Sequence, residues 1–117
     1  MLSRKQLEEY LLSFPNAWLD FPFGEATSVY KVGHTETGGG KMFALIDDKS
    51  QPLRISLKCD PQLAELLRET YETVLPGYHL SKKHWNTIIL TGQVPDDELK
   101  SLMHVSYNLV GGPKTSR

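Results

Sequence analysis

Residues 41–58 read KMFALIDDKSQPLRISLK, two strand-like runs joined by a polar turn that contains a proline. The second run, 53–58, alternates strictly between apolar and polar side chains. One face would carry Leu53, Ile55 and Leu57, and the other would carry Arg54, Ser56 and Lys58. Because successive side chains of a strand point to opposite faces, this pattern predicts a strand with one buried face and one open face.

Further elements extend from this pair in both directions. A strand is predicted over 28–32, joined to 41–47 by the loop 33–40, which holds four glycines and is typical of a flexible hairpin connection. Another strand is predicted over 87–91, where β-branched residues are frequent. The aromatic, proline-broken stretch 18–24 and the Leu75-Pro76-Gly77 segment are predicted to interrupt the regular structure.

Three helices are predicted around these strands. The first begins at Ser3, with Gln6 completing a capping box, and ends before Pro15. The second begins at Asp60, with Pro61 at its first position, and the third begins near Pro95. The order helix, strands, helix, strand, helix predicts one α+β domain over 1–117, a two-layer antiparallel sheet with helices on one face. The other face of the sheet would remain open to water or to a partner.

Composition narrows the functional classes. Thirteen basic residues oppose fourteen acidic ones, so the net charge of -1 indicates neither a polycation nor an acidic tail. A single cysteine, Cys59, excludes an internal disulfide framework and a cysteine-based zinc site. We expect no membrane span, no secretory signal and a reducing, cytoplasmic location.

Charge is segregated locally, although the chain as a whole is nearly neutral. The segment 75–95 contains no acidic residue, and its cations alternate with Tyr78 and Trp85. Cations beside aromatic rings favour phosphates and unpaired bases, so this pattern predicts contact with nucleic acid. The candidate contacts are Lys82, Lys83, His84, His79, Arg54, Lys58, Lys41 and Lys31. The alternative is a solvated loop. Trp85 could stack on a base, but it is expected instead to anchor the loop in the core, and Tyr78 is similar. Phe21 and Phe23 are expected to pack in, or to shape, the turn that ends at Gly24.

No enzyme motif is present. The chain lacks a nucleophile elbow, a P-loop, a dinucleotide fingerprint and a His-Glu-x-x-His pair. His79 and His84 have no acidic neighbour to complete a metal site, and Cys59 has no base or second cysteine nearby. We therefore expect a non-enzymatic protein without metal or cofactor. A cleft near His79 and His84 would be needed to support an enzymatic alternative.

The run LPGYHLSKKHWN at 75–86 resembles the signature of the MmcQ/YjbR-like family. Further blocks that resemble this family stand in the same order: FPFG at 21–24, KMFA at 41–44, ISLK at 55–58, VPDDEL at 94–99 and SYNLV at 106–110. The resemblance implies a fold similar to the frataxin-like (CyaY-like) sandwich and a DNA-binding role through a double-wing arrangement of hairpins. The glycine run at 38–40 departs from the family pattern and puts the wing contacts in doubt.

Two functions are therefore open at this point. The first is a non-enzymatic DNA-binding protein that contacts phosphates through a basic patch on the open sheet face and its loops. Its small number of cations predicts weak affinity and a shallow salt dependence. The second is a protein- or small-ligand-binding module that uses the same open face.

Overall fold

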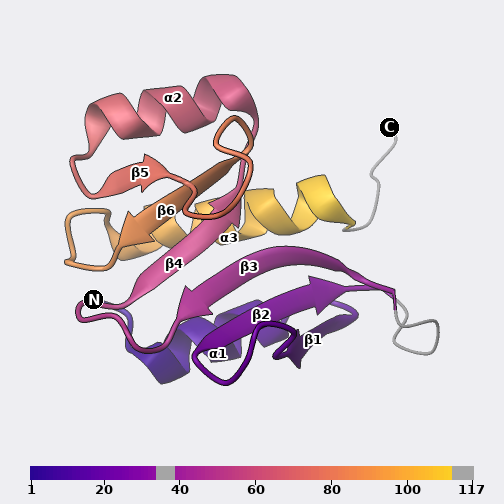
Figure 1. Cartoon of the computed structure of the whole chain (residues 1–117). Helices are drawn as coiled ribbons and strands as arrows, with labels where there is room; N and C mark the ends of the chain where they lie inside the picture. Colours follow the sequence, from indigo (N-terminus) through magenta and orange to yellow (C-terminus); the bar gives the residue numbers. More distant parts are fainter. Residues whose placement is uncertain (34–38, 112–117) are drawn as a thin grey trace.

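The computed structural model describes residues 1–33 and 39–111, which form one antiparallel sheet and three helices (Figure 1). The helices are α1 (Arg4–Leu12), α2 (Pro61–Thr70) and α3 (Asp96–Val110). The strands are β1 (Ala17–Asp20), β2 (Thr27–Val32), β3 (Lys41–Asp47), β4 (Arg54–Lys58), β5 (Val74–Pro76) and β6 (Trp85–Ile89). They are arranged in the order β1-β2-β3-β4-β6-β5, and every neighbouring pair is antiparallel. The predicted α+β class and antiparallel sheet are confirmed.

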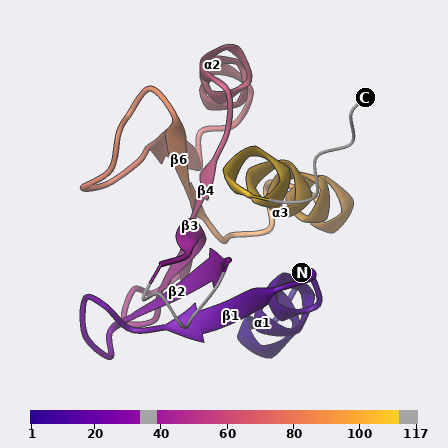
Figure 2. The same ribbon diagram turned by 90° about the vertical axis from the view of Figure 1, so that its right-hand side faces the viewer.

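The helices lie on one side of the sheet, and two loops project from the other side. Figure 2 shows α1 and α3 on one side, with the loops 21–26 and 77–84 extending in the opposite direction. Ala64 and Leu67 of α2 belong to the same buried cluster as Ile88 of β6, so α2 covers the β5–β6 end of the helix-facing side. The face from which the loops project is called the open face below.

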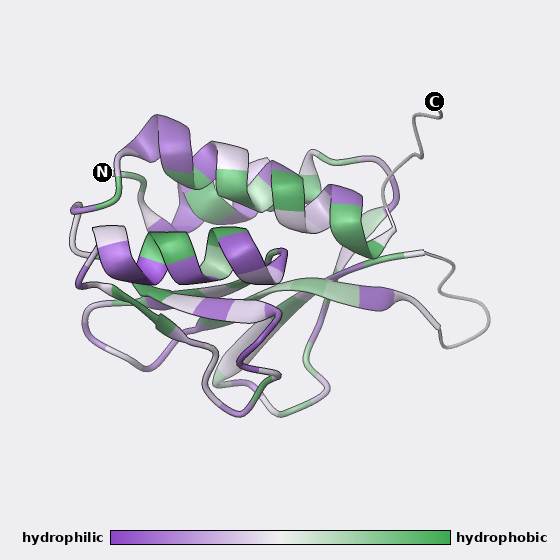
Figure 3. Cartoon of the chain, turned by 90° about the horizontal axis from the view of Figure 1, so that it is seen from above, coloured by the Kyte–Doolittle hydropathy of each residue, from purple (hydrophilic) through white to green (hydrophobic). Residues whose placement is uncertain are grey.

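Alternation along β4 places its side chains as predicted. Ile55 and Leu57 are buried in the core beneath the helices, while Arg54, Ser56 and Lys58 are on the open face. Burial of one branched aliphatic side chain contributes about 1.5–3 kcal/mol. Hydrophobic segments, drawn in green, also recur along the helices between hydrophilic ones (Figure 3). The periodicity of the sequence therefore determines which face of the sheet is left open.

Two edge strands were not predicted. β1 falls in the stretch expected to be irregular, and β5 falls in the segment read as a chain break. Both are short, and β5 ends in Pro76, which is tolerated at a sheet edge because an edge strand has one side without ladder hydrogen bonds. β6 also begins two residues before the predicted position 87. β2 and β3 pair as the predicted hairpin, but residues 34–38 of its connection lie outside the described part of the chain.

The helix starts follow the sequence signals. Ser3 and Gln6 form the predicted reciprocal capping box, and the Asp60 carboxylate accepts the backbone N–H groups of Gln62 and Leu63. α3 begins with three acidic residues in its first turn, where they complement the helix dipole. Within residues 1–33 and 39–111, no helix is long and apolar enough to cross a membrane.

A polar network fastens α1 to the sheet. Arg4 donates through Nε to the Asp48 carboxylate and through Nη2 to the Ser28 hydroxyl, and Ser28 donates to Asp48. Burial opposes ionisation of Asp48, but the hydrogen bonds from Arg4 and Ser28 outweigh it and hold the pKa of this carboxyl below its usual value. Beside them, the Tyr30 hydroxyl donates to Glu8 at 2.7 Å.

The substitution Asp48→Asn should lower the free energy of unfolding by about 2 kcal/mol at neutral pH, because it removes charge-assisted hydrogen bonds. A carboxyl with a lowered folded pKa stabilises the fold above its unfolded pKa of about 3.9, and this stabilisation is lost as pH falls through the folded pKa. Urea unfolding from pH 7 to pH 3 should therefore show the parent and the variant converging in acid. A difference that stays constant over this range would contradict the role of Asp48.

Candidate functional site

The open face is hollowed into a pocket of 520 Å³. Its floor is formed by side chains from β2, β3, β4 and β6: Thr27, Leu45, Asp47, Arg54, Ser56 and Thr87. Phe23 from the loop 21–26 stands on one side, and Tyr78, His79 and Leu80 from the loop 77–84 stand on the other. The open face is therefore a site with a floor and two walls rather than a flat sheet surface.

Two hydroxyl groups of the floor, those of Ser56 and Thr87, form a pair across β4 and β6. Ser56 Oγ and Thr87 Oγ1 are 2.8 Å apart, and Thr87 Oγ1 also accepts the backbone N–H of Tyr78 at 3.2 Å. The pair follows from the strand register, which sets Ser56 directly opposite Thr87. It joins the floor of the pocket to the loop that forms one of its walls.

The loop 77–84 is held by close backbone packing. Gly77 N donates to Trp85 O, and a Cβ added at Gly77 would be 2.7 Å from the Cβ of Trp85, so only glycine permits this approach. Arg68 of α2 donates to the carbonyls of Lys82 and Trp85 and, at 2.7 Å, to Asn86 Oδ1. These contacts fix the loop to α2 and β6 and keep its wall beside the floor.

His79 has a left-handed backbone conformation, which is uncommon in residues other than glycine. Its φ is 59°, in the left-handed region that L-residues rarely adopt, and its ring centroid is 4.0 Å from that of Tyr78. Such conformations are concentrated at functional sites, where the surrounding structure holds them in place. The conformation places two neighbouring rings of one loop in the wall of the pocket.

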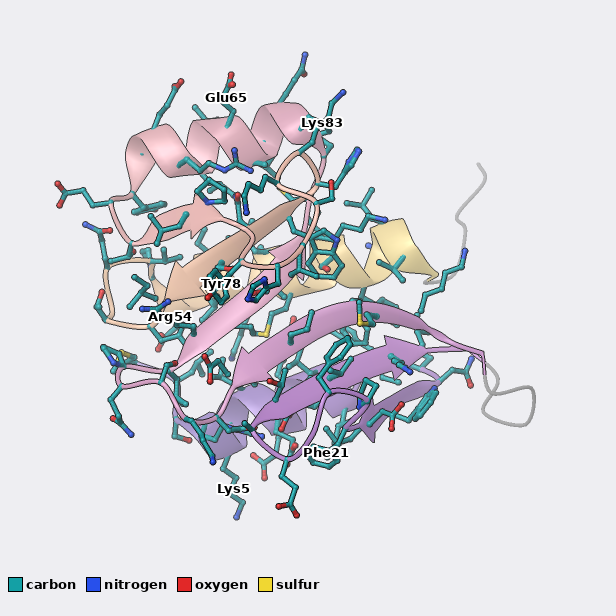
Figure 4. All side chains as sticks on the ribbon, viewed as in Figure 1. Lys5, Phe21, Arg54, Glu65, Tyr78 and Lys83 are labelled. Carbon is teal, nitrogen blue, oxygen red and sulfur yellow. The ribbon has the colours of Figure 1, made fainter. Side chains whose placement is uncertain are left out.

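Arg54 supplies a cation to this pocket. Within the described residues, its guanidinium has no hydrogen-bond or ion-pair partner. Asp47 is directly opposite in the strand register, but its carboxylate accepts the backbone N–H of Lys49 in the following turn. Figure 4 shows Arg54 and Tyr78 on the same part of the open face, with Lys83 beside α2 and away from both. The guanidinium therefore remains available to a ligand.

The eight predicted contact residues do not gather in one place. Arg54 and His79 line the pocket, whereas Lys58 is at the other end of β4, about 13 Å along the strand. Lys58 is opposite Trp85, and the carbonyl of His84 accepts the N–H of Cys59, so this end of β4 adjoins the segment 82–84. Lys58, Lys82, Lys83 and His84 are called the basic cluster below.

Three of the predicted lysines are not free to share one patch: Lys31 and Lys82 already have partners in the protein, and Lys41 lies far along β3. Lys31 Nζ is 2.8 Å from Asp20 and is over the ring of Trp18. Lys41 is the first residue of β3, about 20 Å along the strand from the pocket residue Asp47. Lys82 Nζ donates to the carbonyl of Gly77 at 3.0 Å within its own loop. The structure therefore brings Lys58 next to the segment 82–84, places Arg54 in the pocket, and leaves Lys31 and Lys41 apart from both.

Aromatic side chains gave the clearest differences from expectation. Trp85 is buried, with 8% of its surface exposed, as predicted. Tyr78 and Phe23, which were expected to be packed, are 68% and 62% exposed, and Phe21 is also exposed. Phe23, Tyr78, Ser56 and Thr87 line the pocket but are not among the predicted contact residues. One signal was present for Ser56, because the alternation of 53–58 places it on the same face as Arg54.

Cys59 does not line the pocket. Burial, reinforced by the neighbouring Asp60 carboxylate, raises the pKa of the Cys59 thiol to about 11, so this thiol is a poor nucleophile at neutral pH. In the part of the chain that the structure describes, no group of three or more His, Cys, Asp or Glu side chains is placed to hold a metal ion.

Comparison with known proteins identifies the chain's relatives. The family model described as YjbR matches residues 12–109. The uncharacterized protein YbdF of Escherichia coli O157:H7 is 35% identical over 99 residues, which cover 85% of this chain and 76% of that protein. The uncharacterized protein YyaQ of Bacillus subtilis (strain 168) is 28% identical over 93% of this chain and 98% of its own length.

Solved structures agree in fold. Protein DR2400 of Deinococcus radiodurans, described as a DUF419 domain, superposes with a TM-score of 0.88 at 41% identity, covering 94% of this chain and 79% of that one. The crystal structure of a protein from Pseudomonas syringae superposes with a TM-score of 0.77 at 27% identity. The match covers 94% of this chain and 100% of that chain. The match to the family model extends over most of the chain and includes the strands and loops that build the pocket, so the chain belongs to the YjbR family.

Proposed function

We propose that this domain is a ligand-binding module that takes a small molecule into the open-face pocket. The observation that carries the proposal is the pocket itself, whose volume of 520 Å³ is within the range of about 300–1,000 Å³ typical of small-molecule sites. Apolar side chains form much of its walls, and a few polar groups converge on its floor. This combination is expected of a site that fixes the orientation of a ligand.

Binding rather than catalysis is proposed because the polar groups do not form a reacting set. Among the described residues, the side-chain partner of the Ser56 hydroxyl is Thr87, and neither hydroxyl is hydrogen-bonded to His79. A nucleophile activated by general base catalysis would need such a contact. The pocket near His79 is the cleft that an enzymatic alternative requires, so turnover of any ligand found would count against this part of the proposal.

The test is binding of a mixture of small aromatic compounds, followed by ¹H–¹⁵N NMR spectra of the protein. We expect shifts of the amides of Ser56, Tyr78, His79 and Thr87. The variant Ser56→Trp should fill the pocket and abolish these shifts. Glu65→Trp, on the exposed side of α2, is the matched control and should leave them unchanged. Shifts that survive in Ser56→Trp, or no shift at any pocket amide of the parent, would refute the proposal.

A second candidate function is contact with nucleic-acid phosphates through the basic cluster. Lys83 and His84 are exposed and stand in a segment without acids, and Lys58 adjoins them through the β4–β6 pairing. Three or four cations support only weak binding, with a log–log salt slope of about -0.9 for each phosphate neutralised. Three further predictions belong to this candidate: a double-wing arrangement of hairpins, a relationship to the frataxin-like fold, and a cytoplasmic location.

Fluorescence anisotropy of a short DNA duplex at two salt concentrations tests the second candidate. The double variant Lys82→Glu and Lys83→Glu should remove binding at low salt, whereas Ser56→Trp should leave it intact. Binding that is absent at low salt, or that the double variant does not change, would end the nucleic-acid proposal. The small-ligand proposal would be unaffected by either outcome, because it depends on different residues.

A further inference from the structure

We infer that the ligand of the open-face pocket is a planar aromatic compound that carries an anionic group, a carboxylate or a phosphate. This inference rests on the proposed ligand-binding function and specifies its chemistry. Three properties of the pocket carry it: aromatic side chains on both walls, a guanidinium without a partner, and a hydroxyl hydrogen left over on the floor.

The walls favour a flat, apolar ring. Phe23 and Tyr78 come from different loops and border the same pocket, and both are largely exposed. An aromatic side chain carries a large apolar surface, and leaving it in water forgoes the free energy of its burial. A planar ring bound against these side chains covers apolar surface from both loops. Leu45 and Leu80 extend the apolar lining toward the floor and along one wall.

The charge of the pocket favours an anion. Within the described part of the chain, Arg54 has no partner, while the nearby Asp47 carboxylate accepts the N–H of Lys49. A guanidinium presents several N–H donors in a plane and binds a carboxylate or a phosphate through two parallel hydrogen bonds. Lys31 and Lys82, by contrast, already have oxygen partners in the protein. Arg54 is therefore the group best placed to bind the anionic end of a ligand.

The floor adds one further donor. Ser56 and Thr87 each have one hydroxyl hydrogen, and their mutual hydrogen bond uses one of the two. The N–H of Tyr78 occupies an acceptor site on Thr87, not a donor. Whichever hydroxyl donates within the pair, the hydrogen of the other remains for an acceptor atom on the ligand. An anionic oxygen or a ring nitrogen supplies such an acceptor.

The experiment compares matched probes by isothermal titration calorimetry and NMR. Benzoate is compared with neutral benzamide, and adenosine 5′-monophosphate with adenosine, so that the two arms distinguish a carboxylate from a phosphate. The parent should bind at least one anion about 10-fold more tightly than its neutral partner. Arg54→Gln should abolish this preference and retain binding of the neutral compound. Lys5→Gln removes an exposed cation of α1, which belongs to neither the pocket nor the basic cluster, and should leave the preference unchanged.

The outcomes separate this inference from the function on which it rests. Neutral and anionic probes that bind the pocket equally would overturn the anionic class and leave the ligand-binding function standing. If no probe shifts the pocket amides and the aromatic mixture does not shift them either, both the anionic class and the ligand-binding function are overturned. Asp47→Asn should strengthen anion binding by removing a like charge. If it instead weakens binding, a positively charged group of the ligand contacts Asp47, and the inference of a simple anion is wrong.

Discussion

Replacement of Arg68 by leucine is expected to lower the free energy of unfolding by about 3 kcal/mol and to abolish ligand binding in the pocket. The guanidinium satisfies Asn86 Oδ1 and donates to the carbonyls of Lys82 and Trp85. Asn86 is 2% exposed, so water cannot readily replace the lost donor. A buried polar group left without a partner costs about 1–3 kcal/mol. The same loss frees the loop 77–84, which carries one wall of the pocket.

Urea denaturation measures the stability, and NMR titration with the aromatic mixture measures the binding. Glu65→Leu is the matched control, because this exposed residue is on the same helix and is replaced by the same side chain. The control should change stability by less than about 0.5 kcal/mol. Should Arg68→Leu unfold at the same urea concentration as the control and still bind the mixture, α2 would not be the support of the loop.

Ser106→Ala should cost a similar amount, about 2–4 kcal/mol, although it removes a single oxygen atom. Ser106 is fully buried in α3. Its hydroxyl donates to the carbonyl of Phe43 and accepts the N–H of Lys58 at 2.9 Å. The β3–β4 ladder ends at the pair Ala44–Leu57, and the two strands separate beyond it (Figure 1). Ser106 thus links two backbone groups that no longer reach each other.

Removal of this hydroxyl leaves a buried donor and a buried acceptor without partners. Thermal and urea unfolding of Ser106→Ala should both show the loss, whereas Ser101→Ala, on the exposed side of the same helix, should remain close to the parent. A loss equal to that of the Ser101 control would mean that water or a shift of the strands satisfies both groups.

The packing of helices on one face of the sheet could be predicted from the sequence, because the spacing of the apolar residues indicates which side chains are buried. The alternation of 53–58 and the caps at Ser3 and Asp60 describe local geometry, and the structure confirms them. The edge strands β1 and β5 were not predicted because each is short, and β5 contains a proline. Their formation depends on pairing with a neighbour, which is a tertiary property that propensity does not express.

The pocket could be predicted only in part. Arg54 and Ser56 were expected on the open face, but the walls come from loops at 21–26 and 77–84 that the tertiary fold brings together. Phe23 belongs to a residue type that is usually buried and Tyr78 to one that is intermediate, so residue type alone did not predict that both would be exposed. The available charges could also be predicted only in part. The sequence shows where the basic residues are, but not that Lys31 is paired with Asp20.

The most direct test of the open-face pocket is an NMR titration of the parent protein with benzoate, following the amides of Phe23, Ser56, Tyr78 and Thr87 against those of Lys58, Lys83 and His84. We predict saturable shifts in the first group and none in the second. Shifts confined to the basic cluster, or no saturable shift in the pocket group with either benzoate or the aromatic mixture, would contradict the account.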